Sequence, residues 1–229
     1  MRIAKFIAHC GVCSRRNAEK LIERGLVDVD GVTIDSPALI VSVNNIIEVD
    51  GQKIELIDAL KLWIYYKPIG LITTHNDPQG RKTVFEDLED RLPRVISIGR
   101  LDVSSEGLLL LTNSGTVARY FENPVNEIDR TYKVRVFGGG RPIEFHNKKI
   151  EIDGVIYKPK LIKQTQKTNM NSWYEVILTE GKNREIRRIF EYFGFEVNRL
   201  IRTDFGKYSL GNLEPGQFKE VTLDENYCR

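Results

Sequence analysis

The stretch GRLDVSSEGLLLLTN, residues 99–113, places a carboxylate, Asp102, in a Ser- and Gly-rich loop just before four consecutive leucines. A short apolar run that leads into a polar turn at residues 112–115 predicts an interior β-strand. Loops attached to rigid buried strands commonly hold reactive groups. Asp102 is therefore a candidate functional residue. The plain alternative is a loop aspartate paired with its neighbour Arg100.

Further strands are expected on both sides of this one, with few helices between them. Apolar segments predict strands at 62–66, 95–98, 132–136, 174–178 and 197–201. Short helices are expected at 83–88, capped by Thr83, at 117–121, and through Ile186, Ile189, Phe190 and Phe193 up to Gly194. This order predicts an α+β fold with a mainly antiparallel, mixed β-sheet flanked by helices. The domain is expected to span residues 61–229, with a flexible join at residues 138–140.

Residues 1–50 predict a small separate domain of two helices and short strands. Ile3, Phe6, Ile7 and Cys10 have helical spacing, and Ser14 is a suitable N-cap for a second helix over 15–24. Alternating apolar residues around an Asp-Gly turn predict paired strands near 27–29 and 32–34, and another strand is expected at 46–49. Residues 51–60 are expected to form a linker.

Charge is unevenly distributed along the chain. The composition, 41% hydrophobic and 29% charged, is that of a globular protein, and the net charge is only +2. Basic residues nevertheless cluster in residues 2–24, 158–167 and 182–207. Basic clusters separated by acidic stretches suit a polyanion that touches selected faces of the protein.

The cysteines indicate a reducing compartment. Three cysteines do not make a disulfide framework in a chain of 229 residues. Cys10 and Cys13 form a C-x-x-C pair, but no second pair follows, and His9 alone cannot complete a zinc site. No secretory signal or membrane-length apolar run is found. We therefore expect a cytoplasmic protein that binds no metal.

Several motifs together resemble a known family. Lys67-Pro68-Ile69-Gly70, the loop around Asp102, Arg130-Thr131-Tyr132-Lys133-Val134 and residues 180–188 (EGKNREIRR) are similar to the active-site blocks of RsuA/RluB-type ribosomal RNA pseudouridine synthases. Residues 11–20 and 25–31 resemble an S-four-type RNA-binding domain. The resemblance covers nearly the whole chain, and the last block looks more like enzymes that act on large-subunit RNA.

The resemblance implies a role for each matching residue. Asp102 would be the nucleophile or base, Arg187 the cation beside it, and Tyr132 would stack on the uracil and move a proton. Ile186 would pack against the base and Arg100 would contact a flanking phosphate. Other expected RNA contacts are Lys67, Arg184, Arg15 and Arg16. Isomerising uridine involves no redox change or energy input, so no cofactor is expected. The expected partner is ribosomal RNA, and the expected state is a monomer.

Other interpretations remain open at the level of sequence. Tyr132 could be a cross-strand packing residue, Ile186 a core residue, and the arginines at 184–188 a solvated helix face. The whole chain could be a non-catalytic RNA-binding ribosome-assembly factor. A redox or zinc protein built on Cys10 and Cys13 is a third, less favoured hypothesis.

Overall fold

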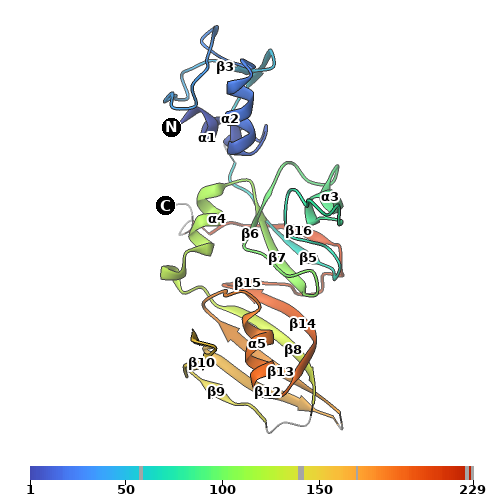
Figure 1. Cartoon of the computed structure of the whole chain (residues 1–229). Helices are drawn as coiled ribbons and strands as arrows, with labels where there is room; N and C mark the ends of the chain where they lie inside the picture. The colour runs from blue at the N-terminus through green and yellow to red at the C-terminus, as the bar shows by residue number, and fades with distance from the viewer. Residues whose placement is uncertain (57–58, 139–141, 169, 225–226, 228–229) are drawn as a thin grey trace.

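The computed structural model describes residues 1–229 except 57–58, 139–141, 169, 225–226 and 228–229. The chain forms a small N-terminal domain next to a larger α+β domain, as Figure 1 shows. The α+β class and the mainly antiparallel sheet predicted from the sequence are confirmed. No helix in the described residues is long and apolar enough to cross a membrane.

The N-terminal domain packs two helices on a four-stranded sheet. The helices are α1 (Ile3–His9) and α2 (Arg15–Glu23), and the sheet has the order β2 (Val32–Thr33), β1 (Val27–Val29), β3 (Ile47–Val49), β4 (Gln52–Ile54). Ser14 caps α2 as predicted, because its Oγ accepts a hydrogen bond from Asn17 N at 3.2 Å. Ile3, Ile7 and Ile22 are fully buried in the core between the two layers.

The sequence prediction for the linker needs correction at its start. Residues 52–54, expected in the linker, form β4, which pairs antiparallel with β3 across the turn at Asp50 and Gly51. This edge strand has a polar sequence with a single isoleucine, so it carries no period-2 apolar signal. Backbone pairing to β3, which sequence patterns do not reveal, determines its conformation.

The larger domain is built on one extended mixed sheet. In the described residues its main path is β16 (Phe218–Val221), β5 (Leu62–Lys67), β7 (Glu106–Thr112), β14 (Glu196–Phe205), β8 (Arg130–Phe137), β13 (Asn171–Leu178), β12 (Leu161–Lys167), β9 (Phe145–His146). Two short strands pair beside this path, β6 (Ile96–Ile98) with β7 and β15 (Tyr208–Ser209) with β14. A separate hairpin joins β10 (Ile150–Ile152) to β11 (Val155–Tyr157). Neighbouring strands are antiparallel except for β7 and β14, which run parallel at the centre.

The four leucines of β7 are buried because both faces of the sheet are covered. Leu109 and Leu111 belong to one apolar cluster, with residues of α5 (Glu185–Tyr192), whereas Leu108 and Leu110 belong to a second, with residues of α4 (Gly115–Glu122). Successive side chains of a strand point to opposite faces, so consecutive leucines fit only a doubly covered strand. Burying each one contributes about 2 kcal/mol.

Gly107 permits the close approach of the two central strands. Its φ is +103°, and a Cβ at this position would lie 2.3 Å from Arg202 O of β14. No side chain fits such a gap. The parallel pairing of β7 with β14 therefore depends on glycine directly after the loop that carries Asp102.

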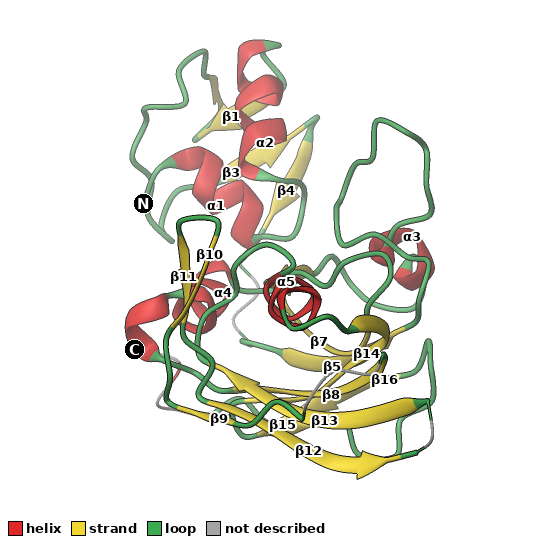
Figure 2. Cartoon of the chain, turned by 60° about the horizontal axis from the view of Figure 1, so that its bottom comes forward, coloured by secondary structure: helices red, strands yellow, loops and turns green. Residues whose placement is uncertain are grey.

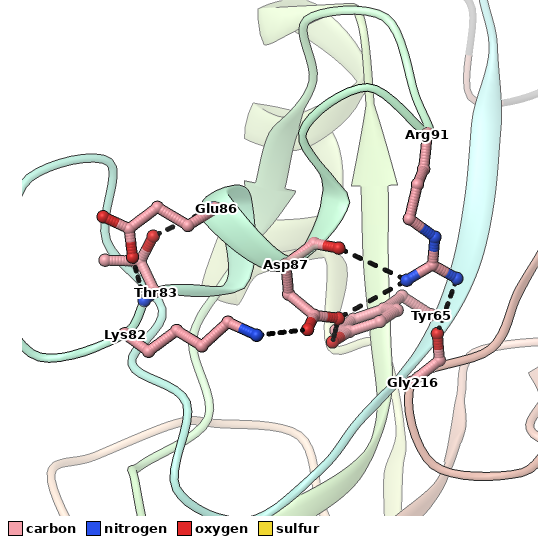
Figure 3. Close-up of polar contacts among 7 residues, drawn as sticks. All are labelled: Tyr65, Lys82, Thr83, Glu86, Asp87, Arg91 and Gly216. Atoms are coloured by element: carbon pink, nitrogen blue, oxygen red, sulfur yellow. Dashed lines mark hydrogen bonds and ion pairs between the residues drawn. The ribbon is translucent and has the colours of Figure 1, made fainter.

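The helix α3 (Val84–Leu88) is anchored to the sheet by a polar network (Figure 3). Thr83 and Glu86 form a capping box, with Thr83 N donating to Glu86 Oε2 at 2.7 Å. Asp87 accepts hydrogen bonds from Tyr65 Oη at 2.8 Å and from Lys82 Nζ at 3.0 Å. Arg91 Nη2 donates to Gly216 O at 2.9 Å. These contacts fix the end of the segment 73–83, where it enters α3.

Several strands of the larger domain were not predicted from the sequence. These are β9 to β12 between residues 145 and 167, and β15 and β16, whose short segments mix polar and apolar residues without a clear period. The flexible join expected at residues 138–140 falls mostly on residues outside the described part of the chain. The short 3₁₀ turn at Pro124–Asn126 follows α4.

Candidate active site

A cavity of about 1530 Å³ lies between the two domains and holds most of the predicted site residues. Figure 2 shows that α5 lies on the side of the large sheet that faces α1 and α2. The cavity is lined by the start of α2, by the loop segments 73–76 and 99–105, by β8 and β14, and by residues 181–187 at the start of α5. Asp102, Tyr132, Arg187, Arg100, Ile186, Arg184, Arg15 and Arg16 all line it.

Asp102 is held in a tight, well-anchored loop between β6 and β7. The residue is half-buried and its backbone oxygen accepts a hydrogen bond from Ser105 N at 3.0 Å. On the preceding residue, Leu101 O accepts a hydrogen bond from Thr73 Oγ1 at 3.0 Å. The Asp102 loop is therefore held by hydrogen bonds on both sides of this carboxylate.

Lys67 lies behind this loop and not in the cavity. Its side chain is fully buried, and Nζ donates to Pro68 O at 3.0 Å, Asp102 O at 3.2 Å and Ser105 O at 2.8 Å. Burial lowers its pKa to about 8, and the negative charges of Asp102 and Glu106 oppose the shift. We expected Lys67 to contact the substrate. Its ammonium group is instead hydrogen-bonded to three backbone carbonyl oxygens, so Lys67 supports the loop that carries Asp102.

Arg187 lies beside the Asp102 loop without pairing directly with the carboxylate. Its Nη2 donates to Ser104 O at 2.9 Å and its Nη1 to Val197 O at 2.8 Å. Burial lowers the pKa of Arg187, and the nearby charge of Asp102 counteracts this. Within the described residues, Asp102 forms no ion pair with Arg187 or with Arg100. Arg187 is therefore fixed to the loop that carries Asp102, and its buried Nε is a donor without a partner among the described residues.

Tyr132 and Ile186 serve the core and the cavity at once. Tyr132 on β8 is 8% exposed and Ile186 in the first turn of α5 is 4% exposed, yet both line the cavity. Both also belong to the main apolar cluster of the large domain. An aromatic and an aliphatic side chain on one cavity wall offer a surface for a planar base. The packing and functional interpretations of these residues are therefore compatible.

The cavity is strongly basic although the whole chain is nearly neutral. Its acidic lining residues are Asp102, Glu122 and Glu185. Its basic lining residues are Arg15, Arg16, Lys20, Arg94, Arg100, Arg130, Lys182, Arg184, Arg187 and Arg202. Arg15 and Arg16 are exposed in the first turn of α2, where free backbone N–H groups also favour anions. This surplus of positive charge suits a phosphate backbone.

Two arginines at the cavity floor were not predicted as site residues. Arg130 stacks on Phe205, with its guanidinium carbon 4.6 Å from the ring centroid, and donates to Thr179 O at 2.9 Å. Arg202 is only 2% exposed, donates from Nε to Leu108 O at 2.7 Å, and has a buried Nη2 without a partner in the described residues. The available signal was the position of Arg202 directly after Leu200 and Ile201 of a predicted strand. A buried charge there is costly unless it is paired or hydrogen-bonded.

Glu185 is a buried acid at the start of α5. It is 3% exposed, and Oε2 accepts a hydrogen bond from Lys182 N at 3.1 Å. Burial, followed by repulsion from Glu180, raises its pKa to about 7. Glu180 is held ionised by its ion pair with Lys182. The loop that presents Lys182 and Arg184 to the cavity is therefore built around an acid pair.

Cys10 and Cys13 do not have the surroundings of a reactive or metal-binding pair. Both thiols are half-buried, and burial raises the pKa of Cys10 to about 11 and that of Cys13 above its usual value. A thiol with a raised pKa is a poor nucleophile and metal ligand. The described residues contain no group of three or more His, Cys, Asp or Glu side chains that could hold a metal ion.

Comparison with known protein families assigns both domains. Residues 61–192 match the model for RNA pseudouridylate synthase, and residues 1–47 match the S4 domain. The chain belongs to the RNA pseudouridylate synthase family. It is an enzyme, an isomerase, and the family resemblance predicted from its motifs is confirmed. Asp102, Tyr132, Ile186 and Arg187 all fall within the matched catalytic segment.

Individual relatives agree with this assignment. The enzyme is 58% identical over 96% of its length to a protein of Rickettsia typhi named "Uncharacterized RNA pseudouridine synthase", covering 91% of that protein. It is 39% identical over its whole length to "Ribosomal large subunit pseudouridine synthase B" of Pasteurella multocida, covering 69% of that relative. A crystal structure titled as a pseudouridylate synthase superimposes with a TM-score of 0.64 at 25% identity, covering 97% of this chain and 96% of the other.

Proposed function

We propose that the enzyme converts a specific uridine of large-subunit ribosomal RNA to pseudouridine, with Asp102 as the catalytic carboxylate and without a cofactor. The observation that carries this proposal is the placement of Asp102, half-buried on a fixed loop, in a cavity whose other charged lining residues are mostly cations. Similarity over the whole of this chain to relatives named for the large ribosomal subunit supports the choice of RNA. The cavity is completed by the two domains of one chain, so we propose that it acts as a monomer.

Binding must first bring the target uridine out of its RNA stack. Extruding a base from folded RNA costs a few kcal/mol. Contacts of Arg15 and Arg16 with the phosphate backbone supply part of this free energy, and Arg100 and Arg184 contact phosphates nearer to the extruded nucleotide. Tyr132 then stacks on the uracil, and Ile186 packs against the same base.

The chemistry exchanges one bond to C1′ for another. The bond from C1′ to N1 breaks, the detached uracil turns, and C1′ bonds to C5. N1 gains a proton and C5 loses one, so the product is an isomer of the substrate. An ionised Asp102 initiates the cleavage, either as a nucleophile at C1′ or as a base on the ribose. Arg187 compensates the negative charge at the site, and the Tyr132 hydroxyl moves the proton from C5.

Tritium release tests this function directly. Large-subunit and small-subunit ribosomal RNA, each labelled with tritium at uridine C5, would be incubated with the wild type, with Asp102→Asn and with the matched control Asp153→Asn. Asp153 lies in the turn of the β10–β11 hairpin with a φ of +51°, a conformation that asparagine also accepts. The wild type and the control should release tritium from large-subunit RNA, and Asp102→Asn should release none.

The same experiment separates the enzyme from a binding protein. A ribosome-assembly factor would bind both labelled RNAs without releasing tritium, and Asp102→Asn would bind as the wild type does. That result would overturn the proposed activity. Release from small-subunit RNA alone would overturn the choice of substrate and leave the role of Asp102 in place.

A further inference from the structure

An aromatic pair on the cavity wall has no part in the chemistry proposed above. His75 stacks on Phe85, with ring centroids 3.5 Å apart and an interplanar angle of 14°. His75 is exposed, Phe85 is half-buried at the start of α3, and both line the cavity that contains Asp102. One face of the imidazole is therefore covered by Phe85, whereas the residue as a whole remains accessible from the cavity.

The pair is mechanically connected to the Asp102 loop. Thr73, two residues before His75, donates from Oγ1 to Leu101 O at 3.0 Å. On the other side, Phe85 lies within α3, which the capping box and the Asp87 contacts of Figure 3 hold against the sheet. The stacked rings therefore occupy a fixed position relative to the catalytic carboxylate.

The guanidinium group of Arg94 lies near the stacked rings of His75 and Phe85. Arg94 lines the same cavity, also lies beside His75 and Phe85 in a smaller adjoining pocket, is half-buried, and has no hydrogen bond or ion pair within the described part of the chain. Partial desolvation, followed by the charge of Arg94, lowers the pKa of His75 to about 4. His75 is thus neutral at physiological pH and presents an uncharged aromatic surface next to a free guanidinium.

We propose that His75, backed by Phe85, is a stacking platform for the base of a nucleotide adjacent to the target uridine, and that Arg94 contacts the phosphate of that nucleotide. This inference rests on the proposed function, because it assumes RNA in the cavity. Base stacking on aromatic side chains is tolerant of sequence and suits unpaired nucleotides. The platform would thus hold the neighbour of the extruded uridine out of the RNA helix while the reaction proceeds.

The test combines steady-state kinetics with a binding signal that needs no catalysis. Full-length wild type, His75→Ala, His75→Phe, Arg94→Gln and the control His146→Ala would be compared for tritium release from large-subunit RNA. His146 is exposed on β9 and does not line the cavity. Each protein would also be titrated into an oligouridylate that carries a single 2-aminopurine, whose fluorescence falls when the base stacks.

His75→Ala should raise KM about tenfold, which is the loss expected for one base–aromatic stack. Its kcat should change less than twofold, and the quenching of 2-aminopurine fluorescence should be lost. His75→Phe should retain both, and Arg94→Gln should raise KM and weaken its dependence on salt. Unchanged quenching in His75→Ala would overturn the platform, as would a His75→Phe variant as impaired as His75→Ala. If the wild type releases no tritium but quenching still depends on His75, the proposed reaction fails and the platform stands.

Discussion

Replacing Glu185 by glutamine should stabilise the enzyme at neutral and alkaline pH. Glu185 has a pKa raised from 4.5 to about 7 by burial and by the neighbouring Glu180. The unfolded chain releases this proton at a lower pH than the folded enzyme does. Glutamine matches the shape of the protonated acid and can accept the hydrogen bond from Lys182 N. Its amide can also donate to the carboxylate of Glu180, which lies within hydrogen-bonding reach of the Glu185 side chain.

The sign and size of the effect follow from the two pKa values. Below pH 4.5 both states hold the proton, so Glu185 contributes no penalty. As the pH rises from 4.5 to 7, the unfolded state ionises while the folded state does not, and stability falls. The full shift corresponds to about 3 kcal/mol at 1.36 kcal/mol per pH unit. Because Glu185 is 3% exposed, solvent screening does not reduce this figure much.

Urea unfolding at pH 4.5 and at pH 8 measures the prediction. The free energy of unfolding of Glu185→Gln should equal that of the wild type at pH 4.5 within about 1 kcal/mol and exceed it by about 2 to 3 kcal/mol at pH 8. Glu151→Gln, an exposed change on β10, is the control and should show no pH-dependent difference. A Glu185→Gln variant that is no more stable than the wild type at pH 8 would refute the assignment of a protonated Glu185.

Three further changes test the supports of the site. Lys67→Met leaves three carbonyl oxygens without their donor. The change should lower the free energy of unfolding by about 3 kcal/mol and should lower kcat at least tenfold. Unchanged kinetics would contradict the role of Lys67 in supporting the Asp102 loop. Gly107→Ala puts a Cβ 2.3 Å from Arg202 O and should cost about 3 kcal/mol or more in the same unfolding assay, and a loss below 1 kcal/mol would argue against this strand contact. Tyr65→Phe removes a donor to Asp87 and should lower the unfolding free energy by about 1 kcal/mol while tritium release is retained, whereas a loss of activity would tie α3 to catalysis.

The sequence was sufficient where local patterns and tertiary structure agree. Four consecutive leucines predicted an interior strand, and β7 is buried along its whole length with side chains in two clusters. The caps at Ser14 and Thr83 were predicted from residue type, and both oxygens accept the expected backbone hydrogen bond. The motif around Asp102 identified the loop, and the structure brings that loop to the same cavity as Tyr132 and Arg187.

The sequence was insufficient where the role of a residue depends on its contacts with segments that are distant along the chain. Lys67 lies in a motif that suggested substrate contact, but the direction of its side chain depends on the Asp102 loop folding over it. The strand β4 depends on pairing with β3, since its own residues are mostly polar. Arg202 falls in the basic cluster at 182–207 that was expected to contact a polyanion, whereas the structure buries it beside Gly107 on the cavity lining. Each of these depends on contacts between distant segments.

Mapping pseudouridine at single-nucleotide resolution in ribosomal RNA treated with the enzyme tests the central claim most directly. Unmodified large-subunit RNA would be incubated with the wild type or with Asp102→Asn, labelled with a carbodiimide that marks pseudouridine, and read by primer extension. We predict one new stop in the large-subunit RNA with the wild type and none with Asp102→Asn. A stop of equal strength with Asp102→Asn, or no new stop with the wild type while the RNA is bound, would contradict the account.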